Sequence, residues 1–202
     1  MDSILRITEK NGAFRAFAAD TTELVNKAVS IHGLSPTSAA TMGRTLTAAS
    51  IMGLDLKDEK ETVSVQIDGD GPVGAIVTVA DRRGDVRGYI ENPYVDLPLK
   101  NGKLDVSQAV GSGYLTVVRN LGMKEPYIGR VELQTGEIAE DIAYYFMNSQ
   151  QTPSVVALGV LVDIDYTVKA AGGYMIQLLP GANEDVISKI EANVYTLQSV
   201  TE

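Results

Sequence analysis

Alternating apolar and polar positions predict strands in the first half of the chain. Residues 4–8 and 14–18 flank Asn11-Gly12, a pair that tolerates the positive φ angles of a tight turn, so we expect a β-hairpin there. Three later segments read as further strands joined by glycine-rich turns: residues 62–67, 73–80 and 86–90.

Two helices are expected between the hairpin and these strands. Asp20, followed three residues later by Glu23, resembles a capping box, in which side chains satisfy the free N–H groups of a helix start. Ser35 is the expected N-cap of the second helix, with Pro36 at its first position. Residues 39–53 are rich in Ala, Gly, Ser and Thr, which predicts a helix packed closely against a sheet.

The second half of the chain continues the mixture of strands and helices. The pattern predicts short or medium helices over residues 105–110 and 137–147, and strands over residues 114–118, 128–133, 155–162 and 168–179. We therefore expect an α+β fold, with a mainly antiparallel sheet and helices packed on its faces.

A final helix capped by Asn183 completes the pattern. It carries an apolar stripe at helical spacing, which we interpret as a possible interface and which consists of Ile187, Ile190, Val194 and Leu197. We expect a core domain over residues 1–182 and a C-terminal helix over residues 183–202.

Composition and charge exclude several classes of function. The net charge is −9 and the basic residues are scattered, so a nucleic-acid partner is disfavoured. There is no cysteine, which excludes disulfides and thiolate metal sites within the sequence.

No apolar run approaches the roughly 20 residues that span a bilayer, and the first residues are too polar for a signal peptide. We expect a cytoplasmic protein without a membrane partner.

One glycine-rich motif has the spacing of a nucleotide site. Gly69, Gly71 and Gly74 match GxGxxG, which cradles a pyrophosphate when a helix follows it. Here the motif joins two expected strands, and Asp68 and Asp70 would repel a phosphate. We interpret it as a tight turn.

Catalytic chemistry is limited by a single histidine. A Ser-His-Asp triad would need His32, with Ser30, Ser35 and Asp20 near it in sequence. His32 precedes the glycine that ends a helix, where an imidazole has a structural role. A small hydrolase stays an alternative, but we assign no catalytic residue.

Acidic residues could in principle hold a cation or act as an acid–base pair. Asp163 and Asp165 flank a turn, but Ca²⁺ takes six to eight oxygen ligands. Glu137, Glu140 and Asp141 lie where a helix begins, and acids there complement the helix dipole. We therefore expect no metal or cofactor site.

Several segments resemble the heat-shock protein 33 family of redox-regulated bacterial chaperones. Residues 149–154 read SQQTPS where the family has Ser-Glu-Gln-x-Pro-Ser, so Gln150 departs from the pattern, and VVALGV follows at residues 155–160. Other similar segments occur in family order along the chain: residues 42–46, 71–74, 84–89, 135–145 (TGEIAEDIAYY) and 171–182 (AGGYMIQLLPGA).

The resemblance implies ATP-independent binding of unfolding proteins by a homodimer that is not an enzyme. Family members continue past the equivalent of Glu202 into a linker and a small domain whose four cysteines bind zinc when reduced and form disulfides when oxidised. Because this sequence has neither, it looks like a truncated, proteolysed or naturally short form. We expect no zinc and a holdase activity that thiol chemistry does not regulate. An inert oligomerisation module is a further alternative.

Overall fold

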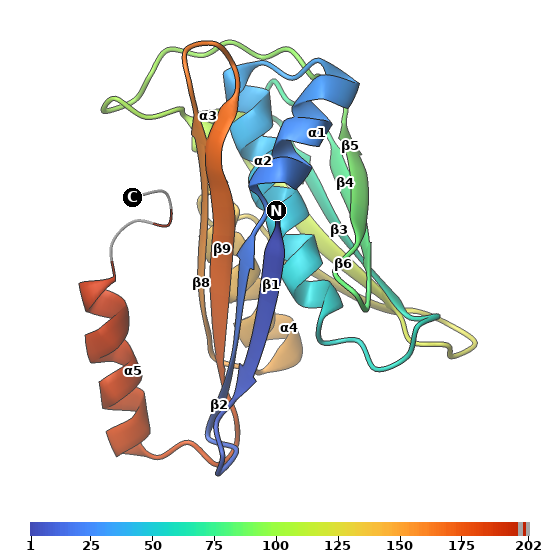
Figure 1. The fold of residues 1–202 in the computed structure, drawn as a ribbon. Helices are drawn as coiled ribbons and strands as arrows, with labels where there is room; N and C mark the ends of the chain where they lie inside the picture. Colours follow the sequence, from blue (N-terminus) through green and yellow to red (C-terminus); the bar gives the residue numbers. More distant parts are fainter. Residues whose placement is uncertain (198–199, 201–202) are drawn as a thin grey trace.

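The computed structural model describes residues 1–197 and 200, which form two antiparallel sheets with helices packed against them (Figure 1). The predicted α+β class is confirmed. The elements follow one another as β1 (Ser3–Thr8), β2 (Phe14–Asp20), α1 (Thr22–His32), α2 (Pro36–Gly53), β3 (Thr62–Gly69), β4 (Ile76–Asp81), β5 (Val86–Ile90), α3 (Val106–Val110), β6 (Gly113–Asn120), β7 (Tyr127–Glu132), α4 (Ala139–Gln150), β8 (Ser154–Val162), β9 (Val168–Leu178) and α5 (Glu184–Thr196).

The two sheets differ in how far apart in sequence their strands lie. One has the strand order β5-β4-β3-β6-β7 and is built from the middle of the chain. The other has the order β1-β2-β9-β8, so the N-terminal hairpin pairs with a strand more than 150 residues later, as Phe17 does with Met175. We call this second sheet the four-stranded sheet.

Helix α2 lies between the sheets and contacts strands of both (Figure 1). All of its residues are buried except Pro36 and Arg44. At Gly43, a Cβ atom would come within 2.9 Å of side-chain carbons of both Val25 and Val160. The small side chains therefore let α2 fit between α1 and the four-stranded sheet, as the composition of residues 39–53 predicted.

The start of α1 differs from the prediction. Helix α1 has no capping box, because Asp20 is still the last residue of β2 and Glu23 turns its carboxylate to the N-terminal amine, 2.9 Å away. Instead, Asp2 reaches across from the chain start and accepts hydrogen bonds from the backbone N–H groups of Glu23 and Leu24, at 2.8 and 2.7 Å.

Other details of the predicted elements also differ from the structure. Ser35 occupies the N-cap position of α2 as predicted, but its hydroxyl bonds the backbone of Val95 and the Ser38 hydroxyl and caps no backbone N–H of the helix. Strand β4 begins at Ile76, because residues 73–75 belong to the preceding turn. Helix α5 ends at Thr196, so Leu197 lies one residue beyond it.

Candidate functional site

The outward side of the four-stranded sheet carries a continuous apolar surface. Directly paired residues share a side of a sheet, and the register places Ile7, Ala16, Ile176 and Val155 in one cross-strand row. The next row holds Leu5, Ala18, Tyr174 and Ala157. We call this surface the outer face and define it as Leu5, Ile7, Phe14, Ala16, Ala18, Val155, Ala157, Leu161, Tyr174, Ile176 and Leu178.

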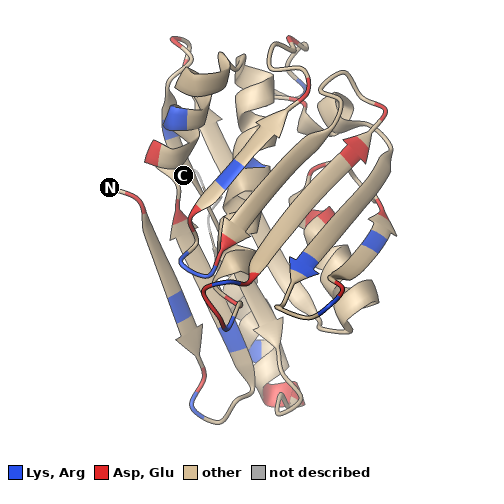
Figure 2. Ribbon diagram, turned by 90° about the vertical axis from the view of Figure 1, so that its right-hand side faces the viewer, with Lys and Arg blue, Asp and Glu red and all other residues tan. Residues whose placement is uncertain are grey.

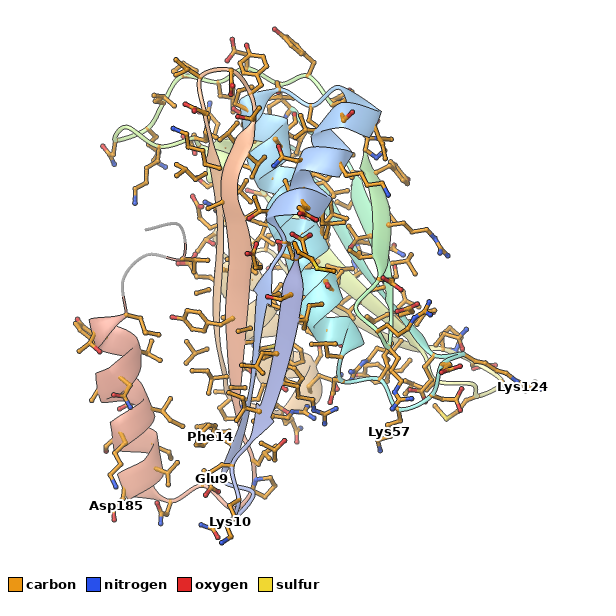
Figure 3. All side chains as sticks on the ribbon, in the orientation of Figure 1. Glu9, Lys10, Phe14, Lys57, Lys124 and Asp185 are labelled. Carbon is orange, nitrogen blue, oxygen red and sulfur yellow. The ribbon has the colours of Figure 1, made fainter. Side chains whose placement is uncertain are left out.

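The opposite side of the same strands explains why the outer face points away from the core. Phe17 and Met175 alternate with outer-face residues along β2 and β9, and each is only 1% exposed. Leu5 and Ile7, in contrast, are 56% and 47% exposed. Figure 3 shows side chains that project from this sheet into the space beside α5, with Glu9 and Lys10 at the tip of the hairpin beyond it.

The outer-face residues are uncharged, but one carboxylate lies among them on the same side of the sheet: the row between Ala18 and Leu161 holds the exposed Asp20, paired with Ser3 and Gly172. The outward positions of the five-stranded sheet include Ser64, Gln66 and Thr116, with Arg130 stacked 3.9 Å from the ring centre of Tyr114. Figure 2 turns that sheet to the viewer and shows both signs of charge spread over it. A contiguous exposed apolar patch is typical of an interaction site.

Helix α5 lies alongside the outer face (Figure 1). None of its residues is buried. Ile187 and Ile190 line a cavity of about 230 Å³ together with Val155, Ile176 and Met147. The stripe predicted from the sequence thus turns partly towards the chain's own sheet.

The end of the described chain also lies over the outer face. Leu197 and Val200 line a second hollow of about 550 Å³, together with Ala18, Gly172 and Tyr174. Leu197 is 54% exposed. Whether the stripe is an interface with another molecule stays a prediction.

A partly buried ionic cluster, which the sequence did not reveal, supports the sheet from its inner side. Asp55 accepts hydrogen bonds from Arg15 of β2 and from Arg119 of β6, with Arg119 Nη2 at 3.1 Å from Asp55 Oδ2. Gln177 accepts from Arg15 Nε at 2.8 Å and donates to Ser154 Oγ at 3.2 Å. These bonds supply the partners that a buried amide requires, and they tie the two sheets together.

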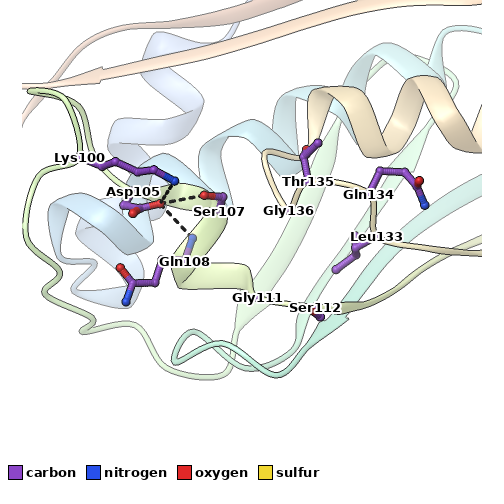
Figure 4. Close-up of a pocket in the computed structure, with 10 residues that line it drawn as sticks. All are labelled: Lys100, Asp105, Ser107, Gln108, Gly111, Ser112, Leu133, Gln134, Thr135 and Gly136. Carbon is purple, nitrogen blue, oxygen red and sulfur yellow. Dashed lines mark hydrogen bonds and ion pairs between the residues drawn. The ribbon is translucent and has the colours of Figure 1, made fainter.

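A polar pocket of about 400 Å³ lies between α3 and the segment that follows β7 (Figure 4). Asp105 accepts hydrogen bonds from Ser107 Oγ at 2.8 Å and from the backbone N–H of Gln108 at 3.0 Å. The hydrogen bond from Gln108, followed by that from Ser107, lowers the pKa of Asp105 below its usual value. Asp105 therefore caps α3, and its carboxylate is occupied by neighbours within the chain.

The GxGxxG motif forms a turn between β3 and β4, with no helix after it. Gly71 N donates to Val110 O at 2.9 Å, and a Cβ atom at Gly71 would collide with the carbonyl of Ala109. Asp70 accepts from the backbone N–H of Ser112 at 2.7 Å. The glycines thus let the end of α3 approach the turn, in agreement with the tight-turn interpretation.

His32 is not brought together with the residues that a triad would need. It is the last residue of α1, and in the described part of the chain its imidazole makes no hydrogen bond. The Ser35 hydroxyl bonds Val95, and the Asp20 carboxylate accepts from the backbone N–H and hydroxyl of Thr22.

The acidic residues singled out in the sequence have partners within the chain. Asp163 pairs with Lys169 at 2.8 Å, and this hydrogen bond lowers the pKa of Asp163 and raises that of Lys169. Glu137 pairs with Arg44 at 2.6 Å. Over residues 1–197 and 200, no three His, Asp or Glu side chains gather in a way that could hold a metal ion.

Comparison with known proteins identifies the family. The family profile described as Hsp33 protein matches residues 2–202. The chain belongs to the Hsp33 family. Its similar relatives include proteins named 33 kDa chaperonin from Alkaliphilus metalliredigens, 52% identical over 98% of this chain and 68% of the relative, and from Acetivibrio thermocellus, 50% identical over 99% and 68%.

A solved Hsp33 structure has the same fold. The crystal structure of the 33 kDa chaperonin (heat shock protein 33 homolog) from Thermotoga maritima superposes with a TM-score of 0.93 at 40% identity. The match covers 98% of this chain and 68% of that one. No helix among the described residues of this Hsp33 family member is both long and apolar enough to cross a membrane.

Proposed function

We propose that this chain is a holdase chaperone that binds unfolding proteins on its outer face and needs no ATP. Family membership and the chaperonin names of the relatives support a chaperone function. The observation that carries the finer proposal is the largely apolar outer face, with Leu5 and Ile7 about half exposed and Asp20 as the charged neighbour on that side. Unfolding proteins share exposed apolar segments, so a largely apolar surface without shape specificity suits many of them.

The energetics favour reversible capture. An apolar patch of about 400 Å² contributes roughly 10 kcal/mol when it is covered, at about 25 cal/mol per Å². Association costs on the order of 4–15 kcal/mol in lost freedom of motion. The net free energy of binding is therefore at most about 6 kcal/mol, so a client is held reversibly.

The experiment is aggregation of a thermally unfolded client, followed by light scattering, with matched charge insertions on the two sheets. Ile7→Lys places a charge on the outer face and should reduce suppression of aggregation several-fold. Ile128→Lys places the same charge on the outward side of the five-stranded sheet, at a residue 61% exposed, and should leave suppression unchanged. If both variants, shown to be folded, suppress aggregation as the parent does, the outer face is not the client site.

We propose a cytoplasmic homodimer that has neither a nucleic-acid partner nor enzymatic activity. The net charge of −9 supports the first exclusion, and the chaperonin names of the relatives support the second. An inert oligomerisation module would use the same apolar surface to bind a second copy. Light scattering separates the two, because an inert module forms dimers but suppresses no aggregation at several-fold molar excess.

A further inference from the structure

We propose that Met147 is an oxidation site whose sulfoxide releases α5 from the outer face. The oxidation of Met147 and the release of α5 do not depend on the proposed function. Only the consequence for client binding rests on the proposed function.

The position of Met147 sets it apart from the other methionines. Met42, Met52 and Met175 are each 1% exposed, whereas Met1, Met123 and Met147 are exposed and can meet an oxidant, Met123 at 61% and Met147 at 54%. Met1, at the start of the chain, lines neither cavity beside α5. Met123 lies between β6 and β7 and lines none of the cavities beside α5. Met147, near the end of α4, lines the cavity that Ile187 and Ile190 close from the side of α5.

The cavity suits a thioether and not a sulfoxide. Its lining is mostly aliphatic, and the two polar side chains in it are Ser154 and Glu191. The Ser154 hydroxyl donates its proton to the carbonyl of Thr152 at 2.9 Å. A carboxylate such as that of Glu191 accepts hydrogen bonds and donates none. No lining side chain therefore offers a free proton to a sulfoxide oxygen. Because Met147 is 54% exposed, that oxygen takes its hydrogen bonds from water at the rim of the cavity, and keeping water there disfavours the packing of Ile187 and Ile190 over the cavity.

The reaction needs only a peroxide. A lone pair of the Met147 sulfur attacks one oxygen of hydrogen peroxide, an S–O bond forms, and the O–O bond breaks. The sulfur is oxidised by two electrons, the peroxide is reduced, and water leaves after proton transfer. No thiol takes part, in keeping with a sequence that has no cysteine.

Helix α5 is attached weakly enough for one added oxygen to shift its position. None of its residues is buried, so few apolar contacts hold it beside the sheet. Segments with few buried contacts open at low free-energy cost. The sulfoxide disfavours the closed arrangement around Ile187 and Ile190, and the freed part of the outer face includes Val155 and Ile176.

The test is hydrogen exchange of the amides of residues 184–196 before and after mild hydrogen peroxide, with peptide mass spectrometry to locate the oxygen. Oxidised parent should lose protection in α5 by about tenfold, and methionine sulfoxide reductase should restore it. Met147→Leu should keep its protection in peroxide, and Met147→Gln should lose protection without peroxide. The matched control Met123→Leu should respond to peroxide as the parent does.

The inference is overturned if peroxide lowers the protection of α5 equally in Met147→Leu and the parent. It is also overturned if Met147→Gln keeps full protection of α5. If α5 opens as expected while aggregation of the client is suppressed no better, the oxidation site stands and the outer face fails as the client surface.

Discussion

The buried carboxylate of Asp141 holds the segment that precedes α4. It is fully buried and accepts hydrogen bonds from the backbone N–H groups of Gln134, Thr135 and Ile138, at 2.7, 3.0 and 2.9 Å. Ile138 has a φ of 75°, a conformation that a β-branched residue rarely adopts. Sequence reasoning explained Asp141 only by the helix dipole, because its three backbone partners depend on how residues 134–138 fold back onto α4.

We predict that Asp141→Ala lowers the free energy of unfolding by about 3 kcal/mol, since three N–H groups lose a charged acceptor. The control is Glu140→Ala, which removes a neighbouring carboxylate with a single exposed bond to the Thr135 hydroxyl. That variant should cost about 0.5 kcal/mol or less. Urea unfolding measures both, and equal midpoints for the two variants would contradict the assigned role of Asp141.

At the scale of elements, the strands were predicted more closely than the helix starts. Strand alternation depends only on neighbours along the chain, so β3 and β5 lie close to where the pattern placed them. The cap of α1 comes from Asp2, about 20 residues earlier, and no local signal points to it. Asn183 is the counterexample, because its side chain accepts from the N–H of Val186 at 3.0 Å, as the local sequence predicted.

We predict that Ile190→Asp reduces the exchange protection of α5 and leaves the melting of the core unchanged, because no residue of α5 is buried. Tyr195→Asp is the matched control, since Tyr195 is 95% exposed and lies outside the cavity. Sedimentation then shows whether the stripe joins two molecules. If Ile190→Asp changes neither protection nor oligomer size, the stripe is not an interface.

The whole molecule consists of two sheets held on opposite sides of α2, with Arg15, Asp55 and Arg119 joining them from within. Tyr145 of α4 packs against Gly129 of β7, and this burial raises the pKa of its hydroxyl to about 12. Packing around α2 and the ion pairs of Asp55 thus hold the two sheets together. The outer face and α5, in contrast, contain exposed apolar side chains such as Leu5, Ile7 and Tyr195.

We predict that the 202-residue chain binds no stoichiometric zinc and that neither thiol reductant nor ATP alters its suppression of aggregation. The reason is the absence of cysteine together with a single histidine, against the four N or S ligands of a structural zinc site. Elemental analysis after mild chelation measures the metal, and light scattering measures activity with and without dithiothreitol and ATP. One zinc ion per chain, or a several-fold change in the suppression of aggregation on adding dithiothreitol or ATP, would contradict the prediction.

The sequence by itself determined the strands, the deep placement of α2 and the cap of α5 by Asn183. Each follows from residue type and spacing within a few positions. Only the tertiary structure decided where the functional surface lies. Alternation shows that Ile7, Ala16, Val155 and Ile176 belong to strands, but which strands pair, and in which register, depends on contacts over about 150 residues. That pairing turns four short apolar stripes into one outer face, because side chains of neighbouring strands share a side of the sheet only when the register aligns them.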